Sequence, residues 1–387
     1  MRRRAMLTAA LLGCLSLLAA GCAASEAPAR DGKIPIGVNV ELTGPASLLG
    51  ASYKNAVDLI VGDINRKGVL GGRQIELIVR DNRSDPAEAT RVAKNLWDNE
   101  RIVAMVGPGT SPTALPVAQE AERRQVPLVS MASSGAVVNP VEQRRYAFKT
   151  SPNNDDMADV QVRELTERRV GRVAYIAPAN AYGDASEAAF LPAARQAGLQ
   201  VVGVERFNDK DKDYTVPVTK LAAKRPQAFA VAAISPQSSL IAKAIKTTGF
   251  AGPVIFEAGA GAELFVKGAG SASEGMLMVH PAILAIDQVA GTTPELLARK
   301  RFFRDYATRH GQFSGFASYA ADALTAIVRA IDAAGSDDPR KIRDAIERQG
   351  FDGLTGRFAF SDRFHGGVVK DSLTVVAVRN GKWTLAD

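Results

Sequence analysis

Residues 102–130 read IVAMVGPGTSPTALPVAQEAERRQVPLVS, and this stretch decides the fold class. The short apolar run at 102–106 predicts a buried strand, and the Gly-Pro-Gly at 107–109 marks a turn after it. A helix is expected over 112–124, with proline at its first position. A second apolar run at 127–130 predicts another strand. The order strand, helix, strand is typical of a parallel sheet covered by helices.

The same alternation runs through the first two thirds of the chain. Ahead of the opening stretch, the pattern predicts a strand, a helix, a strand and a helix at 34–40, 53–65, 75–79 and 86–99. Beyond it the unit repeats, with helices between strands at 172–177, 201–207, 229–234 and 254–256. Because these strands are almost continuously apolar, they fit parallel sheets with helices on both faces. The predicted fold class is therefore α/β.

The last third has a different order. Three successive helices are expected at 294–310, 317–334 and 339–349, and short strands follow at 357–360 and 373–378. Asn380-Gly381 is a strong signal for a hairpin turn, which leads into Trp383. Helices this late in the chain need a sheet to cover, and the first sheet is the candidate. The pattern therefore indicates a chain that crosses between two lobes more than once.

The first twenty-two residues are typical of an exported protein. Arg2, Arg3 and Arg4 precede an apolar run at 5–20, and small residues lead into Cys22. These are the parts of a secretory signal peptide, and the run is too short to span a bilayer comfortably. The Ala-Ala-Gly before Cys22 resembles the lipobox of bacterial lipoproteins, in which the cysteine is lipidated and becomes the mature N-terminus. A plain signal peptide is the alternative.

Composition limits the possible functions. The charged residues give a net charge of +7, which falls to +4 without the three N-terminal arginines, and no basic tract points to nucleic acid. The two cysteines both lie in the leader, so no disulfide is expected in the mature fold. The three histidines are far apart, which argues against a zinc site. No Gly-x-Ser-x-Gly nucleophile motif occurs, so an enzyme is not expected.

Several short motifs, taken in order, resemble type I periplasmic binding proteins of the branched-chain amino acid class, the substrate receptors of ABC importers. The resemblance covers nearly all of the mature chain. The motifs include Leu42-Thr43-Gly44-Pro45, Val106-Gly107-Pro108-Gly109-Thr110-Ser111, Val126-Pro127-Leu128-Val129-Ser130, Ala181-Tyr182-Gly183, Lys212-Asp213-Tyr214-Thr215, Ser273-Glu274-Gly275-Met276 and Ser318-Tyr319-Ala320-Ala321-Asp322.

The resemblance implies two Rossmann-like lobes joined by three hinge crossings, with the ligand trapped when the lobes close. Lobe one would hold residues 33–152 with 281–356, and lobe two residues 153–280 with 357–387. Residues 1–21 would be the signal peptide, and residues 22–32 the lipidated tether.

Several lobe-one residues are candidates for the ligand site. Ser111 is expected to be an N-cap, where free amides and the helix dipole suit a carboxylate. The resemblance implies that Ser111 holds the ligand carboxylate, that Ala132 offers backbone groups and that Ser134 contacts the amino end. Alternatively, these serines only cap helices and turns. Leu49 replaces an aromatic residue of the family, and Phe316 is a possible aromatic wall.

In lobe two, Tyr182 matches a position that closes over the ligand. The family uses an acidic residue after a later strand to pair the ligand ammonium, but Ala258 stands at that position here. Glu257 is one place earlier, and a slip of the loop would deliver it. Ile234 replaces another family aromatic. Because the acid is displaced, the case for a standard α-amino acid is weaker. The expected solute is an amino acid or a related small carboxylate or amide, with an aliphatic or aromatic carboxylate, an amide or another small polar solute as the alternatives to a standard amino acid.

The predicted function is a lipid-anchored, extracytoplasmic substrate-binding protein of an ABC importer. Its permease and ATPase partners would be separate chains, and no cofactor or metal is expected. The alternative is a sensory or regulatory lipoprotein on the same fold, which binds a ligand without transport.

Overall fold

The 102–130 stretch folds as its pattern predicts in the computed structural model, which describes residues 32–386. Strand β3 (Ala104–Val106) leads into helix α3 (Ser111–Arg124), and strand β4 (Leu128–Ser130) returns parallel to β3. Gly107 makes the turn possible. Its φ is +94°, and a side-chain carbon there would lie 2.1 Å from the carbonyl oxygen of Asn39. A larger residue would both strain the backbone and clash.

The start of α3 differs from the expectation in one respect. The helix begins at Ser111, so Thr110, and not Ser111, is the N-cap residue. The Thr110 side chain makes no capping bond to the helix. An acidic side chain from the end of another strand takes the amides of the preceding turn instead, as described below.

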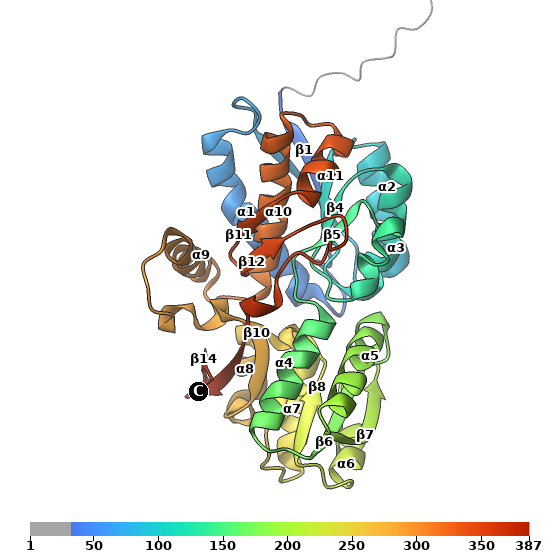
Figure 1. The fold of residues 1–387 in the computed structure, drawn as a ribbon, viewed down its shortest axis with the longest axis vertical. Helices are drawn as coiled ribbons and strands as arrows, with labels where there is room; N and C mark the ends of the chain where they lie inside the picture. The colour runs from blue at the N-terminus through green and yellow to red at the C-terminus, as the bar shows by residue number, and fades with distance from the viewer. Residues whose placement is uncertain (1–31, 387) are drawn as a thin grey trace, which may run out of the picture. The chain divides into compact units, whose positions relative to one another are not determined.

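The first sheet has five strands in the order β2-β1-β3-β4-β5, and every neighbouring pair is parallel. The added strands are β1 (Ile34–Val40), β2 (Ile75–Asp81) and β5 (Ala147–Lys149). One face packs in an apolar cluster with α1 (Ser47–Lys67) and α10 (Phe316–Ala334), and the other with α2 (Pro86–Asp98) and α3. This sheet and its helices are the first lobe (Figure 1).

The second sheet has seven strands in the order β14-β13-β10-β9-β8-β6-β7. The strands are β6 (Arg172–Pro178), β7 (Gln200–Phe207), β8 (Ala228–Val231), β9 (Val254–Phe256), β10 (Leu277–Pro281), β13 (Leu373–Arg379) and β14 (Lys382–Leu385). The helices are α4 (Asn154–Glu167), α5 (Ala181–Gln196), α6 (Thr215–Ala222), α7 (Gln237–Thr247) and α8 (Glu263–Ala269). This sheet and these helices are the second lobe. The first sheet is all parallel, and the second is parallel except where β13 and β14 join it antiparallel. Each lobe is thus an α/β unit, and the predicted fold class is confirmed.

The chain returns to the first lobe late, as the helical pattern predicts. Helix α9 (Pro294–His310) precedes α10, and α11 (Pro339–Glu347) packs against α10 before the short strands β11 (Gly350–Asp352) and β12 (Arg357–Ala359). The final hairpin is confirmed: β13 and β14 pair antiparallel, and Asn380 and Gly381 have φ of 52° and 69°. Two positive φ angles are what a two-residue hairpin turn requires.

Helix α1 begins earlier than expected, at Ser47 instead of residue 53. Its first turn packs closely on the end of β1, since a side-chain carbon at Gly50 would lie 2.0 Å from the carbonyl oxygen of Glu41. A glycine that weakens the helical pattern in sequence is therefore the residue that allows this contact.

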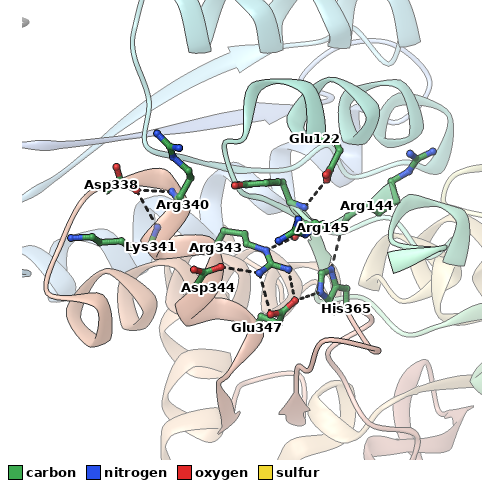
Figure 2. Close-up of polar contacts among 11 residues, drawn as sticks. Glu122, Arg144, Arg145, Asp338, Arg340, Lys341, Arg343, Asp344, Glu347 and His365 are labelled. Atoms are coloured by element: carbon green, nitrogen blue, oxygen red, sulfur yellow. Dashed lines mark hydrogen bonds and ion pairs between the residues drawn. The ribbon is translucent and has the colours of Figure 1, made fainter. Parts of the chain in front are cut away.

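A charged network ties the returning chain to the first sheet (Figure 2). Arg343 of α11 pairs with Asp344 and Glu347, and Glu347 Oε1 lies 3.3 Å from His365 Nε2. The Nδ1 of His365 lies 2.9 Å from the carbonyl oxygen of Ala147 in β5. The segment around residue 365 is thereby fixed against β5.

The predicted signal peptide and Cys22 lie outside the described residues. Within residues 32–386, no helix combines the length and apolar character needed to cross a membrane.

Candidate functional site

A cavity of about 270 Å³ lies where strands of both lobes end. Its first-lobe lining includes Leu49, Tyr53, Ser111, Met131, Ser133, Phe316 and Tyr319. Its second-lobe lining includes Asn180, Tyr182, Phe207, Asp209, Ile234 and Gln237. The carboxyl edge of parallel strands is where open α/β sheets bind ligands. The volume suits one small solute.

Five of the predicted site residues line this cavity: Leu49, Ser111, Tyr182, Ile234 and Phe316. Ser111 is 2% exposed, and its Oγ accepts a bond from the Ser134 amide at 3.3 Å. Its hydroxyl hydrogen stays available, because a hydroxyl can donate and accept together.

Ala132 and Ser134 are buried and do not line the cavity. The amide of Ala132 donates to Ser130 Oγ, and its carbonyl accepts from Ser151 Oγ at 2.7 Å. Ser134 caps a short 3-10 helix by accepting from the Ala136 amide. The lining positions are instead Met131 and Ser133. Hydrogen bonds inside the loop therefore decide which of its residues face the ligand.

Glu41 is the site residue that the sequence interpretation missed. It directly follows β1 and is fully buried. Its carboxylate accepts from the Gly109 and Thr110 amides at 3.1 and 3.2 Å and from the Thr113 hydroxyl at 2.7 Å. Asn82 Nδ2 adds a bond at 3.3 Å. Burial raises the pKa of Glu41, and these hydrogen bonds oppose the rise. Two amides of the turn expected to serve a ligand, those of Gly109 and Thr110, are thus already bonded to Glu41.

Gly109 separates Glu41 from the cavity. A side-chain carbon there would lie 2.1 Å from the Tyr53 ring and 2.9 Å from Glu41 Oε2. The Tyr53 and Phe316 rings meet edge to face at 6.4 Å between centroids. The Glu41 carboxyl thus lies one residue behind an aromatic wall.

Tyr319 connects the cavity to the strand β10. Its hydroxyl lies 3.1 Å from His280 Nε2, and His280 Nδ1 lies 2.9 Å from the Pro281 carbonyl oxygen. Since the carbonyl can only accept, Nδ1 carries the hydrogen and Nε2 accepts from Tyr319. Burial lowers the pKa of His280 to about 4, so the ring is neutral at physiological pH.

Glu257 directly follows β9 and is fully buried behind Tyr182. It does not line the cavity, which differs from the expectation that it meets the ligand. Its Oε2 accepts from the hydroxyls of Tyr182 and Ser186, both at 2.9 Å, and from Asn154 Nδ2 at 3.3 Å. Burial raises the pKa of Glu257 to about 7. Its other oxygen has no hydrogen-bond partner among the described residues.

Two polar residues at the second-lobe wall were also missed. Asp209 accepts two bonds from Asn180 Nδ2, at 2.9 and 2.7 Å. Gln237 donates through Nε2 to the Asp209 carbonyl at 3.0 Å, while its buried Oε1 has no partner among the described residues. Within that part of the chain, no His, Cys, Asp and Glu cluster could hold a metal ion.

A protein-family model described as periplasmic binding protein matches residues 33–382. The chain belongs to the periplasmic binding protein family. Its match extends from the first residues of β1 into β14, so it includes both walls of the cavity. The two-lobe type I fold is that of this family.

Relatives and solved structures agree with this assignment. The chain is 25% identical to the leucine-, isoleucine-, valine-, threonine- and alanine-binding protein of Pseudomonas aeruginosa over 344 residues, or 88% of each chain. It is 26% identical to an extracellular ligand-binding receptor from Rhodopseudomonas palustris HaA2, with a TM-score of 0.85 and coverage of 91% and 99%. A branched-chain amino acid transporter substrate-binding protein from Streptococcus pneumoniae, solved with isoleucine, shares the fold at 24% identity, with a TM-score of 0.79 and coverage of 92% and 99%.

Proposed function

We propose that this periplasmic binding protein is the substrate receptor of an ABC importer. The observation that carries the proposal is the cavity between the two lobes, whose walls bring side chains from both sheets around one small volume. A solute that contacts both lobes stabilises the closed conformation of the protein. Ligand binding is thereby coupled to a change in conformation. A permease with its ATPases, on separate chains, would read that shape.

The proposed solute is an amino acid or a related small carboxylate or amide. Support comes from the apolar lining around a few polar groups, which suits a solute with an aliphatic or aromatic body. The name of the Pseudomonas aeruginosa relative points in the same direction.

The lobes would move about hinges that separate residues 33–152 with 281–356 from residues 153–280 with 357–387, although β12 and the segment around His365 pack beside β11 and β5 of the first lobe. The buried Lys149 lies next to the first crossing and donates to the carbonyls of Ser151 and Pro152, at 3.0 and 3.1 Å. These bonds support a defined path for the chain at this point.

We also propose that residues 1–21 are removed on export and that Cys22 carries the lipid anchor. The support is the sequence of the leader. Cys22→Ser in the full chain, expressed in a bacterial host, should prevent lipidation. The loss of the lipid mass from the N-terminal peptide and the release of the protein from membranes would be measured together. A protein that stays on the membrane without the cysteine would contradict the anchor.

The solute proposal is tested by a thermal-shift screen of the purified protein against amino acids, aliphatic and aromatic acids, amides, sugars and polyamines. A ligand at a hundred times its dissociation constant adds about 2.7 kcal/mol to the stability of the folded state. Ser111→Ala is the matched variant for any hit, and Ser336→Ala, far along the chain from the lining, is its control. A silent screen with well-folded protein would count against the receptor function.

A further inference from the structure

In the part of the chain that the structure describes, no basic side chain lines the cavity. None of its lining residues is Lys, Arg or His. Its ionisable residues are Asp209 and three tyrosines. Carboxylates are usually recognised by Arg, Lys or free amides. Free amides at the start of α3 are therefore what a ligand carboxylate would need in the first lobe.

Glu41 has already taken amides at that place. The Gly109 and Thr110 amides and the Thr113 hydroxyl donate to its carboxylate. All three donors lie in the turn and first helical turn that border Ser111. A ligand carboxylate held at Ser111 would find fewer donors there and would lie near a buried negative charge. Like charges in a poorly solvated site repel each other strongly.

The second-lobe wall also offers acceptors. Gln237 Oε1 is buried and has no partner among the described residues, and Gln237 is 4% exposed. Its Nε2, which could serve a carboxylate, is engaged with the Asp209 carbonyl. Asp209 itself is an acceptor at the same wall. A solute that donates hydrogen bonds would satisfy these groups, and a carboxylate would not.

The aromatic part of the cavity lining suits a solute with an apolar body and a cationic or neutral polar group. Five aromatic rings line the cavity: Tyr53, Tyr182, Phe207, Phe316 and Tyr319. Aromatic faces attract ammonium groups and also accept apolar surface.

The buried Lys149 does not offer a ligand carboxylate a hydrogen-bond donor. Lys149 is fully buried behind Ser151 and Pro152, which line the cavity. Its ammonium donates to the Ser151 and Pro152 carbonyls and to Asn153 Oδ1, at 3.0, 3.1 and 2.8 Å. These bonds use its three donors, so none is left for a ligand.

We propose that Glu41 is a specificity-determining residue: it takes two amides and a hydroxyl at the start of α3 from within, so the cavity selects a small, largely apolar amine or amide over a carboxylate. This inference rests on the proposed receptor function and revises its solute class: it keeps amides, adds amines and disfavours carboxylates. Glu41 acts through the amides and the electric field, and does not itself touch the solute.

The test compares four compounds with the same branched apolar body: isocaproate, isocaproamide, isoamylamine and leucine. Their dissociation constants for the purified protein are measured by calorimetry at neutral pH. We expect the amide or the amine to bind at least about tenfold more tightly than isocaproate, with leucine weaker than the better of the two. Isocaproate or leucine as the tightest ligand would overturn the inference and leave the receptor function standing. Failure of all four to bind to well-folded protein would overturn the inference, whereas the receptor function would fall only with a silent broad screen.

The variant Glu41→Gln keeps the size of the side chain and removes its charge. In Glu41→Gln, the ratio of the isocaproate dissociation constant to that of the amide or amine should fall by about tenfold. Glu142→Gln, at an exposed position, should leave this ratio unchanged. An unchanged preference in a folded Glu41→Gln protein would overturn the role of Glu41. Asp209→Asn gives a second measurement if Glu41→Gln does not fold: it should weaken isoamylamine and not isocaproate, and equal effects on both would count against the inference.

Discussion

Glu41 and Glu257 occupy equivalent places in the two lobes and have different surroundings. Each directly follows a strand that has neighbours on both sides, each is fully buried, and each lies behind one wall of the cavity. Glu41 accepts from two backbone amides, a hydroxyl and a side-chain amide. Glu257 accepts from two hydroxyls and a side-chain amide, all through one oxygen.

The comparison shows that burial alone does not determine whether a carboxyl group is protonated. Burial raises the pKa of both residues, but only Glu41 has backbone amides as donors. Amides at a helix start are oriented by the fold and stabilise a negative charge, whereas hydroxyls can also serve a neutral acid by rotating. We therefore expect Glu41 to act as a fixed charge and Glu257 to change its protonation near neutral pH.

The largest expected effect is that of Glu41→Ala. Removing the carboxylate leaves the Gly109 and Thr110 amides and the Thr113 hydroxyl without their acceptor, so the free energy of unfolding should fall by about 4 kcal/mol. Denaturant unfolding measures this loss. The exposed Glu142→Ala is the control and should stay within about 0.5 kcal/mol of wild type. A loss below about 1 kcal/mol in Glu41→Ala would contradict the fixed-charge interpretation.

Glu257→Gln should change how stability depends on pH. The folded state holds the Glu257 proton up to about pH 7, against about 4.5 for the usual carboxyl, because burial raises its pKa. The contribution of Glu257 to stability is therefore complete below about pH 4.5 and declines as pH rises to about 7. The stability difference between wild type and Glu257→Gln should shift by about 3 kcal/mol across this range.

The difference between the two proteins is the quantity to follow, because His280 and other groups titrate in the same range. Burial lowers the pKa of His280 to about 4, so its contribution grows with pH and opposes that of Glu257. A constant difference between wild type and Glu257→Gln from pH 4.5 to 7 would show that Glu257 is ionised throughout.

Removing one hydroxyl donor from each acid compares Glu41 and Glu257 through smaller changes in stability. Thr113→Val removes a donor to Glu41, and Ser186→Ala removes a donor to Glu257. We expect a loss of about 2 kcal/mol for Thr113→Val, since its acceptor is charged, and about 1 kcal/mol for Ser186→Ala. Ser186→Ala should also raise the pKa of Glu257, because this bond lowers it in the wild type. Equal losses with no change in pH dependence would erase the distinction between the two acids.

The sequence predicted the fold well because the strands carry a strong periodic signal. Residues 254–256 and 294–310 form the predicted strand and helix at the predicted boundaries. Helix α1 was placed six residues late, because the close contact of Gly50 with Glu41 is a tertiary feature that local propensity does not show.

The loops that carry the candidate site residues border the cavity, but not every candidate side chain lines it. Ser111, Tyr182 and Phe316 reach the cavity, whereas Ser134 is turned away by bonds to its own loop. Such bonds cannot be read from spacing. Glu41 did carry a signal, since an acid immediately after a buried strand needs donors nearby, and the amides of the next strand's turn lie at the same sheet edge.

The smallest expected effect comes from Tyr319→Phe. This variant tests whether the protonation of Glu41 and Glu257 is independent of the hydrogen bond between Tyr319 and His280. The Tyr319 hydroxyl donates to the neutral His280 and to neither carboxylate. Its loss should cost about 1 kcal/mol, as for Ser186→Ala, but should leave the pH dependence assigned to Glu257 unchanged. NMR titration follows the protonation of His280 directly, because the chain has only three histidines whose signals must be assigned. His280 should stay neutral well below pH 6 in both proteins, with a pKa that rises in Tyr319→Phe as the neutral ring loses its donor. A shifted Glu257 titration in this variant would mean that the two walls form one coupled electrostatic unit.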